Sequence, residues 1–281
     1  MSIHIPSAEG EAATAQVRTN LPDALPVLPL RESVPFPEAL MPLAIGQERS
    51  IRLVNDVLAG NRMLVMVASR LDWDDEEPGP EDLYRVGVAG VVARMLKMPD
   101  GTLRILVHGA QRVLLTDFTA TEPYLVASIE DAPDELIPSP ELEALHRNVQ
   151  ATFSRIIEEL PYLPEELQIA VANLDDPSEL AHMIAGALRL KTDEKQALLD
   201  ERNVTKRLRM LSELLAREVE LAEIGTRIQS QVQSEMDRGQ REWFLRQQLK
   251  AIQEELGEVD ELQAEATELR ERLEAAGLPE H

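Results

Sequence analysis

The C-terminal part of the chain contains a long stretch without proline, and this stretch constrains the fold more than any other sequence feature. It runs from Val204 to Leu256. Because proline breaks the interior of a helix, its absence permits one continuous helix, about 80 Å long at about 1.5 Å per residue. Gly225 and Gly239 lie within the stretch, and each destabilises a helix by about 1 kcal/mol relative to alanine. We predict a long helix over residues 204–257 that bends or breaks, if anywhere, at these glycines.

The last turns of this predicted helix carry a regular apolar stripe. Four aliphatic residues recur at spacings of four, three and four, which is the a/d pattern of a packing seam. Burying one leucine stabilises a structure by about 1.5–3 kcal/mol, whereas a surface pair on a helix contributes about 0.2–0.5 kcal/mol. The stripe therefore needs a partner, either a neighbouring helix or another protomer. The predicted packing or assembly seam, which includes two aromatic residues, comprises Trp243, Phe244, Leu245, Leu249, Ile252 and Leu256.

The composition indicates an acidic, folded protein. The chain has 281 residues, a formal net charge of −23 and no cysteine. A hydrophobic fraction of 44%, arranged with regular periodicity, predicts a folded chain, and the length favours two domains. Aromatic residues make up only 3% of the chain, so the core must be mainly aliphatic. Because bulk acidity repels phosphate, nucleic acid is not an expected partner.

The first residues predict a tail rather than a targeting segment. Residues 1–22 lack a basic region followed by an apolar one and are rich in small and polar residues, so we predict a disordered tail there. No apolar run approaches the ~20 residues that a membrane-spanning helix needs, so no membrane association is expected. The absence of cysteine excludes a disulfide framework and fits a reducing compartment. We predict a cytoplasmic protein.

Residues 23–133 have the pattern of a β-rich subdomain. Five prolines near its start exclude a helix and, through most of that segment, a central strand, so short edge strands are expected. Gly87 and Gly90, within a later strand pattern, indicate a bulge or a tight bend. Pro99–Gly101 predicts a hairpin turn in which glycine adopts a positive φ. We predict a curved sheet or pseudo-barrel with one or two helices.

Residues 139–203 have the pattern of a helical subdomain. Ser139 is a good N-cap, and Pro140 suits the first helical position after it. Pro164 and Pro177 mark two further helix starts by the same argument. The predicted fold class is therefore α+β: a β-rich subdomain, a helical bundle and a long helix. Residues 258–281 are predicted to begin a linker.

The common motifs of catalysis and ligand binding do not occur. There is no GxxxxGK[ST] phosphate loop, no GxSxG nucleophile elbow and no HExxH helix. The acidic run at residues 72–82 lacks the EF-hand spacing and predicts a solvated loop rather than a calcium site. The five histidines are scattered, as surface or core residues are. We predict no catalytic, cofactor-binding or metal-binding residues in this chain.

Two segments resemble the Lon family of ATP-dependent proteases. The segment "LPVLPLRESVPFPEALMPLAIGQERSI", which begins at Leu25, resembles the family's N-terminal opening. The segment "REWFLRQQLKAIQEELGE", which begins at Arg241, resembles the one that precedes the family's ATPase module. The first pattern also occurs in proteins that carry only the Lon-type substrate domain. The resemblance implies a substrate-recognition subdomain, a helical subdomain and a connector helix.

The resemblance further implies the N-terminal fragment of an ATP-dependent serine endopeptidase, which binds unfolded or damaged proteins and aids hexamer assembly. The family's Walker motifs and Ser–Lys dyad have no matching positions here, so ATP and Mg are expected only for a missing AAA+ module. One alternative is a stand-alone Lon-domain adaptor, and another is a coiled-coil scaffold, for which the proline-rich first half has no use. A Walker A loop beyond His281 would exclude the adaptor.

One cluster of residues is a candidate for contact with substrate. A site that accepts many unfolded chains needs exposed, adaptable apolar surface, and methionine supplies it through a flexible thioether. Met95, Leu96 and Met98 directly precede the predicted turn at Pro99–Gly101. We hypothesise that they bind substrate. The alternative is that they are ordinary core residues at the end of a strand.

Overall fold

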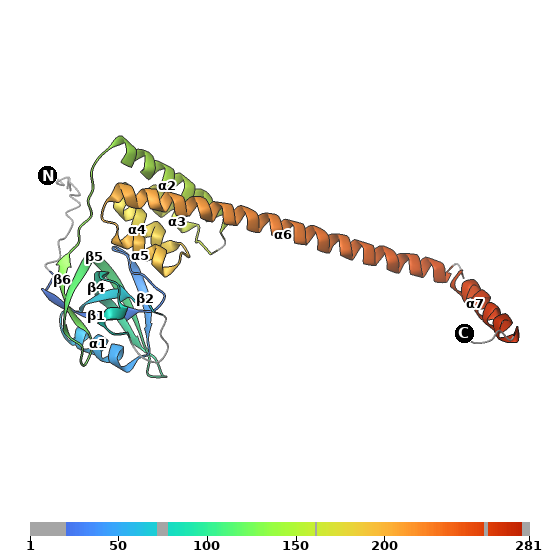
Figure 1. Cartoon of the computed structure of the whole chain (residues 1–281), viewed down its shortest axis with the longest axis horizontal. Coiled ribbons are helices and arrows are strands. Elements are labelled where there is room, and N and C mark those ends of the chain that lie inside the picture. The colour runs from blue at the N-terminus through green and yellow to red at the C-terminus, as the bar shows by residue number, and fades with distance from the viewer. Residues whose placement is uncertain (1–20, 72–77, 161, 256–257, 277–281) are drawn as a thin grey trace, which may run out of the picture. The chain divides into compact units, whose positions relative to one another are not determined.

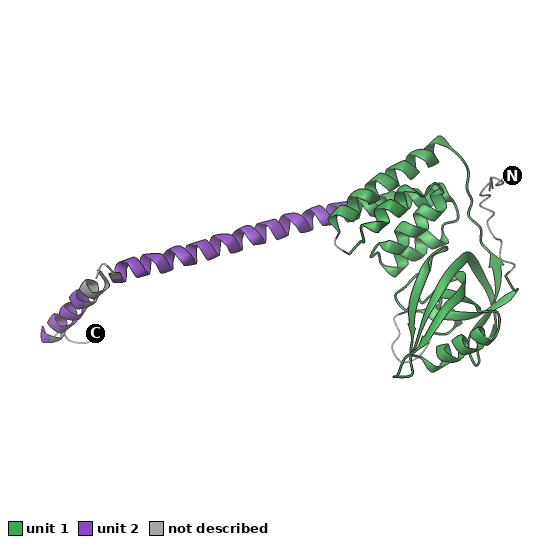
Figure 2. Cartoon of the chain, turned by 180° about the vertical axis from the view of Figure 1, so that it is seen from behind, with its two compact units in different colours: residues 1–218 green, residues 219–281 purple. Residues whose placement is uncertain are grey.

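The computed structural model describes residues 21–71, 78–160, 162–255 and 258–276. The chain divides into two compact units, residues 1–218 and 219–281, coloured separately in Figure 2. The predicted tail over residues 1–22 falls almost entirely outside the described residues, as does most of the acidic run that begins at Asp72. The finer domain boundaries given above stay predictions.

A six-stranded sheet forms the first part of the first unit (Figure 1). Its order is β2-β5-β4-β3-β1-β6, and β5 also pairs with β6, so every strand except β2 joins a closed ring. The predicted pseudo-barrel is therefore confirmed, with α1 (Glu48–Ala59) and a short 3-10 turn (Pro80–Asp82) as its helices. The strands are β1 Ala24–Leu30, β2 Leu40–Ile45, β3 Met63–Ala68, β4 Val86–Lys97, β5 Leu103–Ala120 and β6 Val126–Asp131.

The long strand β5 makes the closure possible. Its first part pairs with β2 and β4, and its later part pairs with β4 and β6. A register shift between Ala89 and Gly90 confirms the predicted bulge. A Cβ atom on Gly87 would lie 2.5 Å from the Met66 carbonyl oxygen, and one on Gly90 would lie 2.7 Å from that of His108. Glycine is required at both positions because neighbouring backbone approaches too closely for a side chain.

The expectation that prolines exclude a central strand is wrong for β1. This strand contains Pro26 and Pro29, yet it lies between β3 and β6 in the sheet. The two neighbours pair with different halves: residues 24–26 pair with β6, and residues 27–30 pair with β3. At each proline, β1 therefore pairs with a strand on one side only. Proline lacks an N–H donor, and it is tolerated where one edge of the strand is unpaired.

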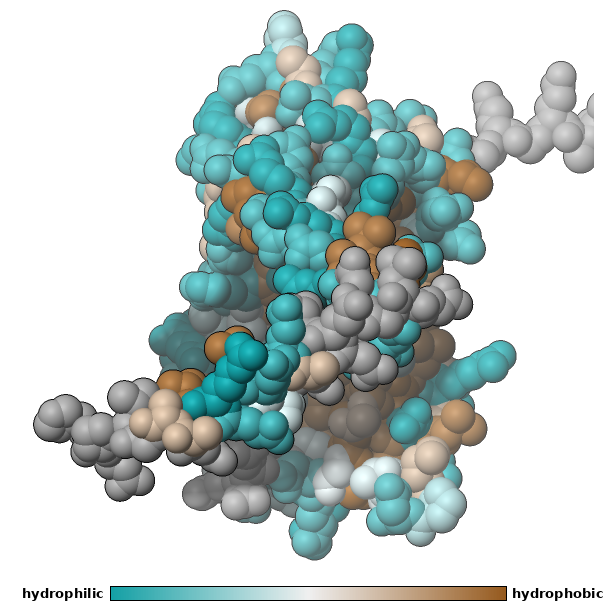
Figure 3. Space-filling model, turned by 90° about the vertical axis from the view of Figure 1, so that its right-hand side faces the viewer, coloured by the Kyte–Doolittle hydropathy of each residue, from teal (hydrophilic) through white to brown (hydrophobic). Residues whose placement is uncertain are grey.

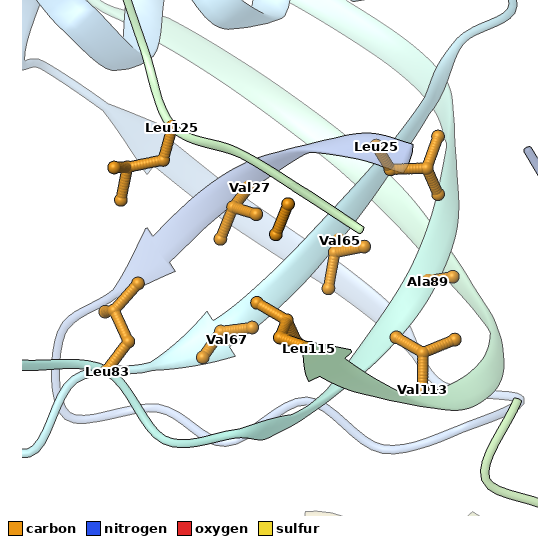
Figure 4. Close-up of a cluster of buried hydrophobic side chains, with 10 residues drawn as sticks. Leu25, Val27, Val65, Val67, Leu83, Ala89, Val113, Leu115 and Leu125 are labelled. Carbon is orange, nitrogen blue, oxygen red and sulfur yellow. The ribbon is translucent and has the colours of Figure 1, made fainter. Parts of the chain in front are cut away.

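The barrel core is aliphatic, as the composition predicted. Figure 4 shows side chains from β1, β3, β4 and β5 pointing toward one another in the barrel interior. Tyr84 and Phe118 pack against this cluster but are only partly buried. The turn at Pro99–Gly101 is also confirmed, because Gly101 has a φ of 87°. The buried cluster comprises Leu25, Val27, Val65, Val67, Leu83, Ala89, Val113, Leu115, Leu125 and Ala127.

Short helices follow the barrel and gather around the start of α6 (Figure 1). The predicted N-cap is confirmed, since the Ser139 side chain accepts a hydrogen bond from the Leu142 N–H at 3.1 Å. Pro140 and Pro177 each occupy the start of a helix, whereas Pro164 precedes α3 by two residues. The helices are α2 Pro140–Glu159, α3 Glu166–Ala172, α4 Pro177–Ala187 and α5 Thr192–Asp200.

The predicted long helix is α6, Val204–Glu255. It continues through Gly225 and Gly239, so neither glycine ends it. Its first turns complete the helical part of the first unit, where Val204, Leu208 and Leu211 are fully buried. A further helix, α7, covers Glu258–Ala275. No helix within the described ranges is both long enough and apolar enough to cross a membrane.

Candidate functional site

The structure does not bring the three predicted binding residues onto one surface. In the β4–β5 register, Met95 lies opposite Ile105 and Leu96 lies opposite Arg104. Successive residues of a strand point to opposite faces, so Met95 and Leu96 face opposite sides of the sheet. Leu96 is 67% exposed and Met95 is 36% exposed. Met98 follows the strand, is partly buried and closes the turn by donating its N–H to the Thr102 carbonyl oxygen.

An apolar strip nevertheless crosses the sheet on the face of Leu96. Residues directly opposite in an antiparallel pair point to the same side. Pro42 on β2 and Arg94 on β4 both lie opposite Leu106 on β5, and Leu40 lies two residues from Pro42 on the same face. Leu40 is 58% exposed. We name this surface the outer strip, and its apolar members are Leu40, Pro42, Leu96 and Leu106.

A pocket of about 460 Å³ lies next to the outer strip. One wall is the segment between β1 and β2 together with the start of β2, and the other wall comes from the helical part. Leu40 and Pro42 belong both to the outer strip and to the lining of this pocket. The apolar lining also includes Phe36 and Met183. The polar lining includes Glu32, Glu38, Glu179, His182 and Lys195.

A buried polar cluster holds the barrel and the helices together beside the pocket. Asp134, in the segment between β6 and α2, accepts hydrogen bonds from Arg112 of β5 and Arg207 of α6. The Ser178 hydroxyl of α4 donates to the same carboxylate. Arg112 and Arg207 are 4% and 0% exposed. Since a buried charge is stable only when it is paired, these contacts tie β5, α4 and α6 together through one carboxylate.

The remaining donors of the two arginines bind backbone carbonyl groups. Arg112 Nε donates to the Ala132 carbonyl oxygen at 2.9 Å, and its Nη1 donates to that of Leu199 at 2.9 Å. Arg207 Nε donates to the carbonyl oxygen of Glu201 at 3.0 Å. Both buried guanidinium groups are thus hydrogen-bonded to carboxylate and to carbonyl oxygen at the C-terminal end of α5, where negative partial charge gathers.

Two pKa values in the cluster shift strongly. Burial raises the pKa of Asp134, but hydrogen bonds and charge from Arg207, Ser178 and Arg112 outweigh burial and hold this pKa well below its usual range. Burial, reinforced by the positive charge of Arg207, lowers the pKa of His182 to about 3. Arg207 Nη1 lies 2.9 Å from His182 Nε2, and a guanidinium only donates, so Nε2 is the acceptor of a neutral ring.

The described seam residues are exposed within one chain. Each of the two aromatic and three aliphatic residues is more than half exposed. Leu256 lies outside the described residues. No partner therefore covers the described seam residues in the single chain, and their role in packing or assembly stays a prediction. The five residues are Trp243, Phe244, Leu245, Leu249 and Ile252.

Sequence reasoning missed a further apolar stripe on α6, which begins before the predicted seam in the sequence. Leu221, Val232 and Trp243 recur every eleven residues, and such a repeat keeps residues on one face of a nearly straight helix. At about 100° per residue, this face lies about 130° around the helix from the centre of Leu245, Leu249 and Ile252. We name the latter three the second stripe. The first stripe comprises Leu221, Ile224, Ile228, Val232, Met236 and Trp243, all of them exposed.

The described residues contain no group of three or more His, Asp or Glu side chains that could hold a metal ion. The face that Figure 3 shows is largely hydrophilic, with several small hydrophobic groups and one larger, shaded hydrophobic area in the lower right of the view. The arrangement of strands and helices defines the structural class of the protein: an α+β domain in which a small closed barrel is joined to a helical bundle.

Comparison with known proteins identifies the family within this class. The model of the ATP-dependent protease La (LON) substrate-binding domain matches residues 24–217. The chain belongs to this family. It is 42% identical to the Lon protease of Dictyoglomus thermophilum over 92% of this chain and 33% of that protein. It is 43% identical to Lon protease 1 of Herpetosiphon aurantiacus over 92% of this chain and 32% of that protein.

The chain therefore spans about a third of the length of the curated relatives that it matches. Among solved structures, the N-terminal domain of the Mycobacterium avium complex Lon protease superposes with a TM-score of 0.57. The match covers 69% of this chain and 98% of that domain, at 22% sequence identity. At this identity the match supports the fold alone.

Proposed function

We propose that the chain is the substrate-binding N-terminal part of an ATP-dependent Lon protease and that it binds unfolded or damaged proteins. The observation that carries this proposal is the outer strip, in which Leu40 and Leu96 are 58% and 67% exposed on one face of the sheet. Exposed apolar residues grouped on a soluble domain favour a binding site. The family match to a substrate-binding domain supports the same function.

The proposal extends to the whole protein. ATP hydrolysis with Mg, and peptide-bond cleavage by a Ser–Lys dyad, would be carried out by an AAA+ module and a protease domain outside the present sequence. The length of the matched Lon proteases supports this assignment over a stand-alone adaptor. A cytoplasmic location accompanies the proposal, and nucleic acid and membranes are not proposed as partners.

We also propose that α6 contributes to hexamer assembly. Its two apolar stripes are exposed in one chain, and helices with such stripes gain stability when a second helix covers them. Two stripes on different faces would allow one helix to contact two neighbours. A closed assembly with more than two subunits needs contacts of this kind.

The binding proposal is tested with a fluorescently labelled, permanently unfolded protein of low net charge. The double variant Leu40→Ser/Leu96→Ser should bind it at least about tenfold more weakly than the wild type, because burial of each leucine stabilises by about 1.5–3 kcal/mol. Binding should survive added salt, since charges are screened beyond about 8 Å at physiological ionic strength.

The matched control is Ile137→Ser/Ile169→Ser, which removes two equally exposed apolar side chains outside the outer strip. It should bind like the wild type. Met95→Ser tests the opposite face of β4 separately, and circular dichroism checks that each variant is folded. Equal affinity of the outer-strip variant and the wild type would remove this surface from the binding site.

A further inference from the structure

We propose that the pocket beside the outer strip binds a basic side chain that stands next to a large apolar one in an unfolded client protein. This inference rests on the proposed function, because it assumes that the chain binds unfolded proteins. It adds a preference for one class of segment.

The pocket is a built site with two fixed walls. On the helical wall, His182 accepts a hydrogen bond from the buried Arg207, at 2.9 Å. On the other wall, the ring of Phe36 lies 5.9 Å from the ring of His182. The polar cluster around Asp134 therefore fixes the wall against which Phe36 packs. The pocket has a volume of about 460 Å³, which suits a small ligand or a few side chains, since ligand pockets span about 300–1,000 Å³.

The apolar part of the lining suits a large hydrophobic side chain. Phe36 lies beneath the lining and is only 1% exposed, whereas the partly exposed Met41 and Met183 supply flexible thioethers from the two walls. Leu40 and Pro42 belong to both the pocket and the outer strip, so the two surfaces are continuous. A client segment that contacts Leu40 and Pro42 of the outer strip therefore also reaches the pocket.

The charged part of the lining has an excess of carboxylates. Among the described residues that line the pocket, Glu32, Glu38 and Glu179 carry carboxylates, and Lys195 carries an ammonium group. Burial and then the neighbouring carboxylates of Asp176 and Glu38 raise the pKa of Glu179, so the carboxylates here repel one another. A guanidinium or ammonium group of a ligand would relieve this repulsion.

The backbone presents two of these carboxylates at a conformational cost. Glu32 and Glu38 have φ angles of 53° and 60°, in the left-handed region that non-glycine residues rarely adopt. The Glu38 N–H donates to the Gly109 carbonyl oxygen at 2.9 Å, and this contact holds the conformation. A Cβ atom on Gly109 would lie 2.6 Å from the Phe36 carbonyl oxygen, so the sheet and this segment are in close contact. Such strain persists where the surrounding structure over-determines it, and it often accompanies binding sites.

These features favour one occupant. An acidic segment would meet both the excess carboxylates and the net charge of −23. A purely apolar segment would bring no positive charge to these carboxylates, of which Glu38 already lies 3.7 Å from His108 Nε2 through Oε2. A segment with a basic residue beside a large apolar residue satisfies both parts of the lining.

The test compares three labelled peptides of equal length that contain the same apolar residues. One carries an arginine beside a leucine, one carries glutamine in place of that arginine, and one carries glutamate there. We expect the arginine peptide to bind the wild type at least fivefold more tightly than the glutamine peptide, and the glutamate peptide to bind most weakly.

Two sets of variants locate this preference. Glu38→Gln/Glu179→Gln should abolish the difference between the arginine and glutamine peptides, whereas Glu166→Gln/Glu213→Gln, two exposed acids of the helical part outside the pocket lining, should keep it. A Cβ atom at Gly186 meets only Phe36, at 3.8 Å. Gly186→Leu should therefore occupy part of the pocket and weaken all three peptides at least threefold, and Gly186→Ala should bind like the wild type.

The outcomes separate this inference from the proposed function. If the arginine preference persists in Glu38→Gln/Glu179→Gln, or Gly186→Leu binds like the wild type, the pocket is not the site and this inference is overturned. If those variants still bind the labelled, permanently unfolded protein of low net charge, the proposed function stands. A Gly186→Leu variant that changes only its sedimentation would identify a second copy as the occupant and would also overturn the inference. Failure of the wild type to bind any unfolded protein would contradict the proposed function itself.

Discussion

The barrel with its helices and the exposed length of α6 use the same residue types in opposite ways. In the first unit, aliphatic residues such as Leu25 and Val65 are at most 1% exposed. On α6, Leu221 and Leu249 repeat with equal regularity but are 55% and 57% exposed. Periodicity predicts which face of an element is apolar, and it does not tell what covers that face. The first unit therefore owes its stability to its own packing, whereas the second unit displays apolar surface that a partner can bury.

The buried polar cluster offers the largest test of this difference. Asp134→Ala would leave Arg112 and Arg207 buried without their shared carboxylate, and removing one partner of a buried ion pair costs about 3–5 kcal/mol. We expect the free energy of unfolding of the first unit, measured with urea, to fall by this amount. Glu141→Ala breaks the exposed pair with Arg209 and should cost about 0–1 kcal/mol. Equal effects of the two variants would contradict the structural role of the cluster.

Glycine-to-alanine substitutions should have opposite effects in the two regions. Gly87→Ala would place a Cβ atom 2.5 Å from the Met66 carbonyl oxygen, so the barrel should lose about 1–3 kcal/mol, as in an overpacked core. Gly225 and Gly239 have no atom within 4 Å of such a Cβ, so alanine at each should stabilise α6 by about 1 kcal/mol. Thermal unfolding followed by circular dichroism measures both. A Gly225→Ala helix that melts earlier than the wild type would contradict the regular helix described here.

The two stripes of α6 can be separated by charge substitutions. Leu249→Asp/Ile252→Asp introduces two charges into the second stripe, and Ile228→Asp/Val232→Asp does the same in the first. If a stripe mediates self-association, its variant should dissociate at a concentration at least about tenfold higher, which corresponds to about 1.4 kcal/mol. Sedimentation velocity measures this, and the helical signal should persist. If the wild type associates and neither variant changes its sedimentation, the stripes have no part in assembly.

Much of the architecture could be predicted from local patterns, because the chemistry that sets it is local. Ser139 with Pro140 starts a helix by its own hydrogen bonding, and Gly101 permits the hairpin turn by its own φ. The prolines of β1 led to a wrong prediction about this strand. Proline is accepted there because the two neighbouring strands pair with different halves of β1, and that offset is a non-local property.

The candidate surfaces were less predictable for the same reason. Met95 and Leu96 are adjacent in sequence but face opposite sides of the sheet. The residue beside Leu96 on its own face is Arg104 of β5, and only the strand register determines this. Leu40 joins the outer strip only because β2 pairs with β5. The polar cluster gathers Arg112, Asp134 and Arg207 from distant positions, and no spacing in the sequence relates them.

The last expected effect is a pH dependence confined to the first unit. The pKa of His182 is lowered to about 3 in the folded state, against about 6.5 in an unfolded chain. As the pH falls below 6.5, the unfolded state binds a proton that the folded state does not, so the free energy of unfolding falls by about 1.4 kcal/mol per pH unit. Asp134, whose lowered pKa acts only below the unfolded value of about 3.9, adds nothing between pH 5 and 7.

His182→Gln removes this proton while leaving an acceptor for Arg207, so its free energy of unfolding should fall less steeply over the same range. Urea unfolding at pH 5, 6, 7, 7.5 and 8 measures the two slopes. Between pH 7.5 and 8 the curves should run parallel, because the histidine is then neutral in both states and no longer contributes. Slopes that remain equal down to pH 5 would mean that His182 takes up its proton in the folded state, and that the neutral acceptor described here is incorrect.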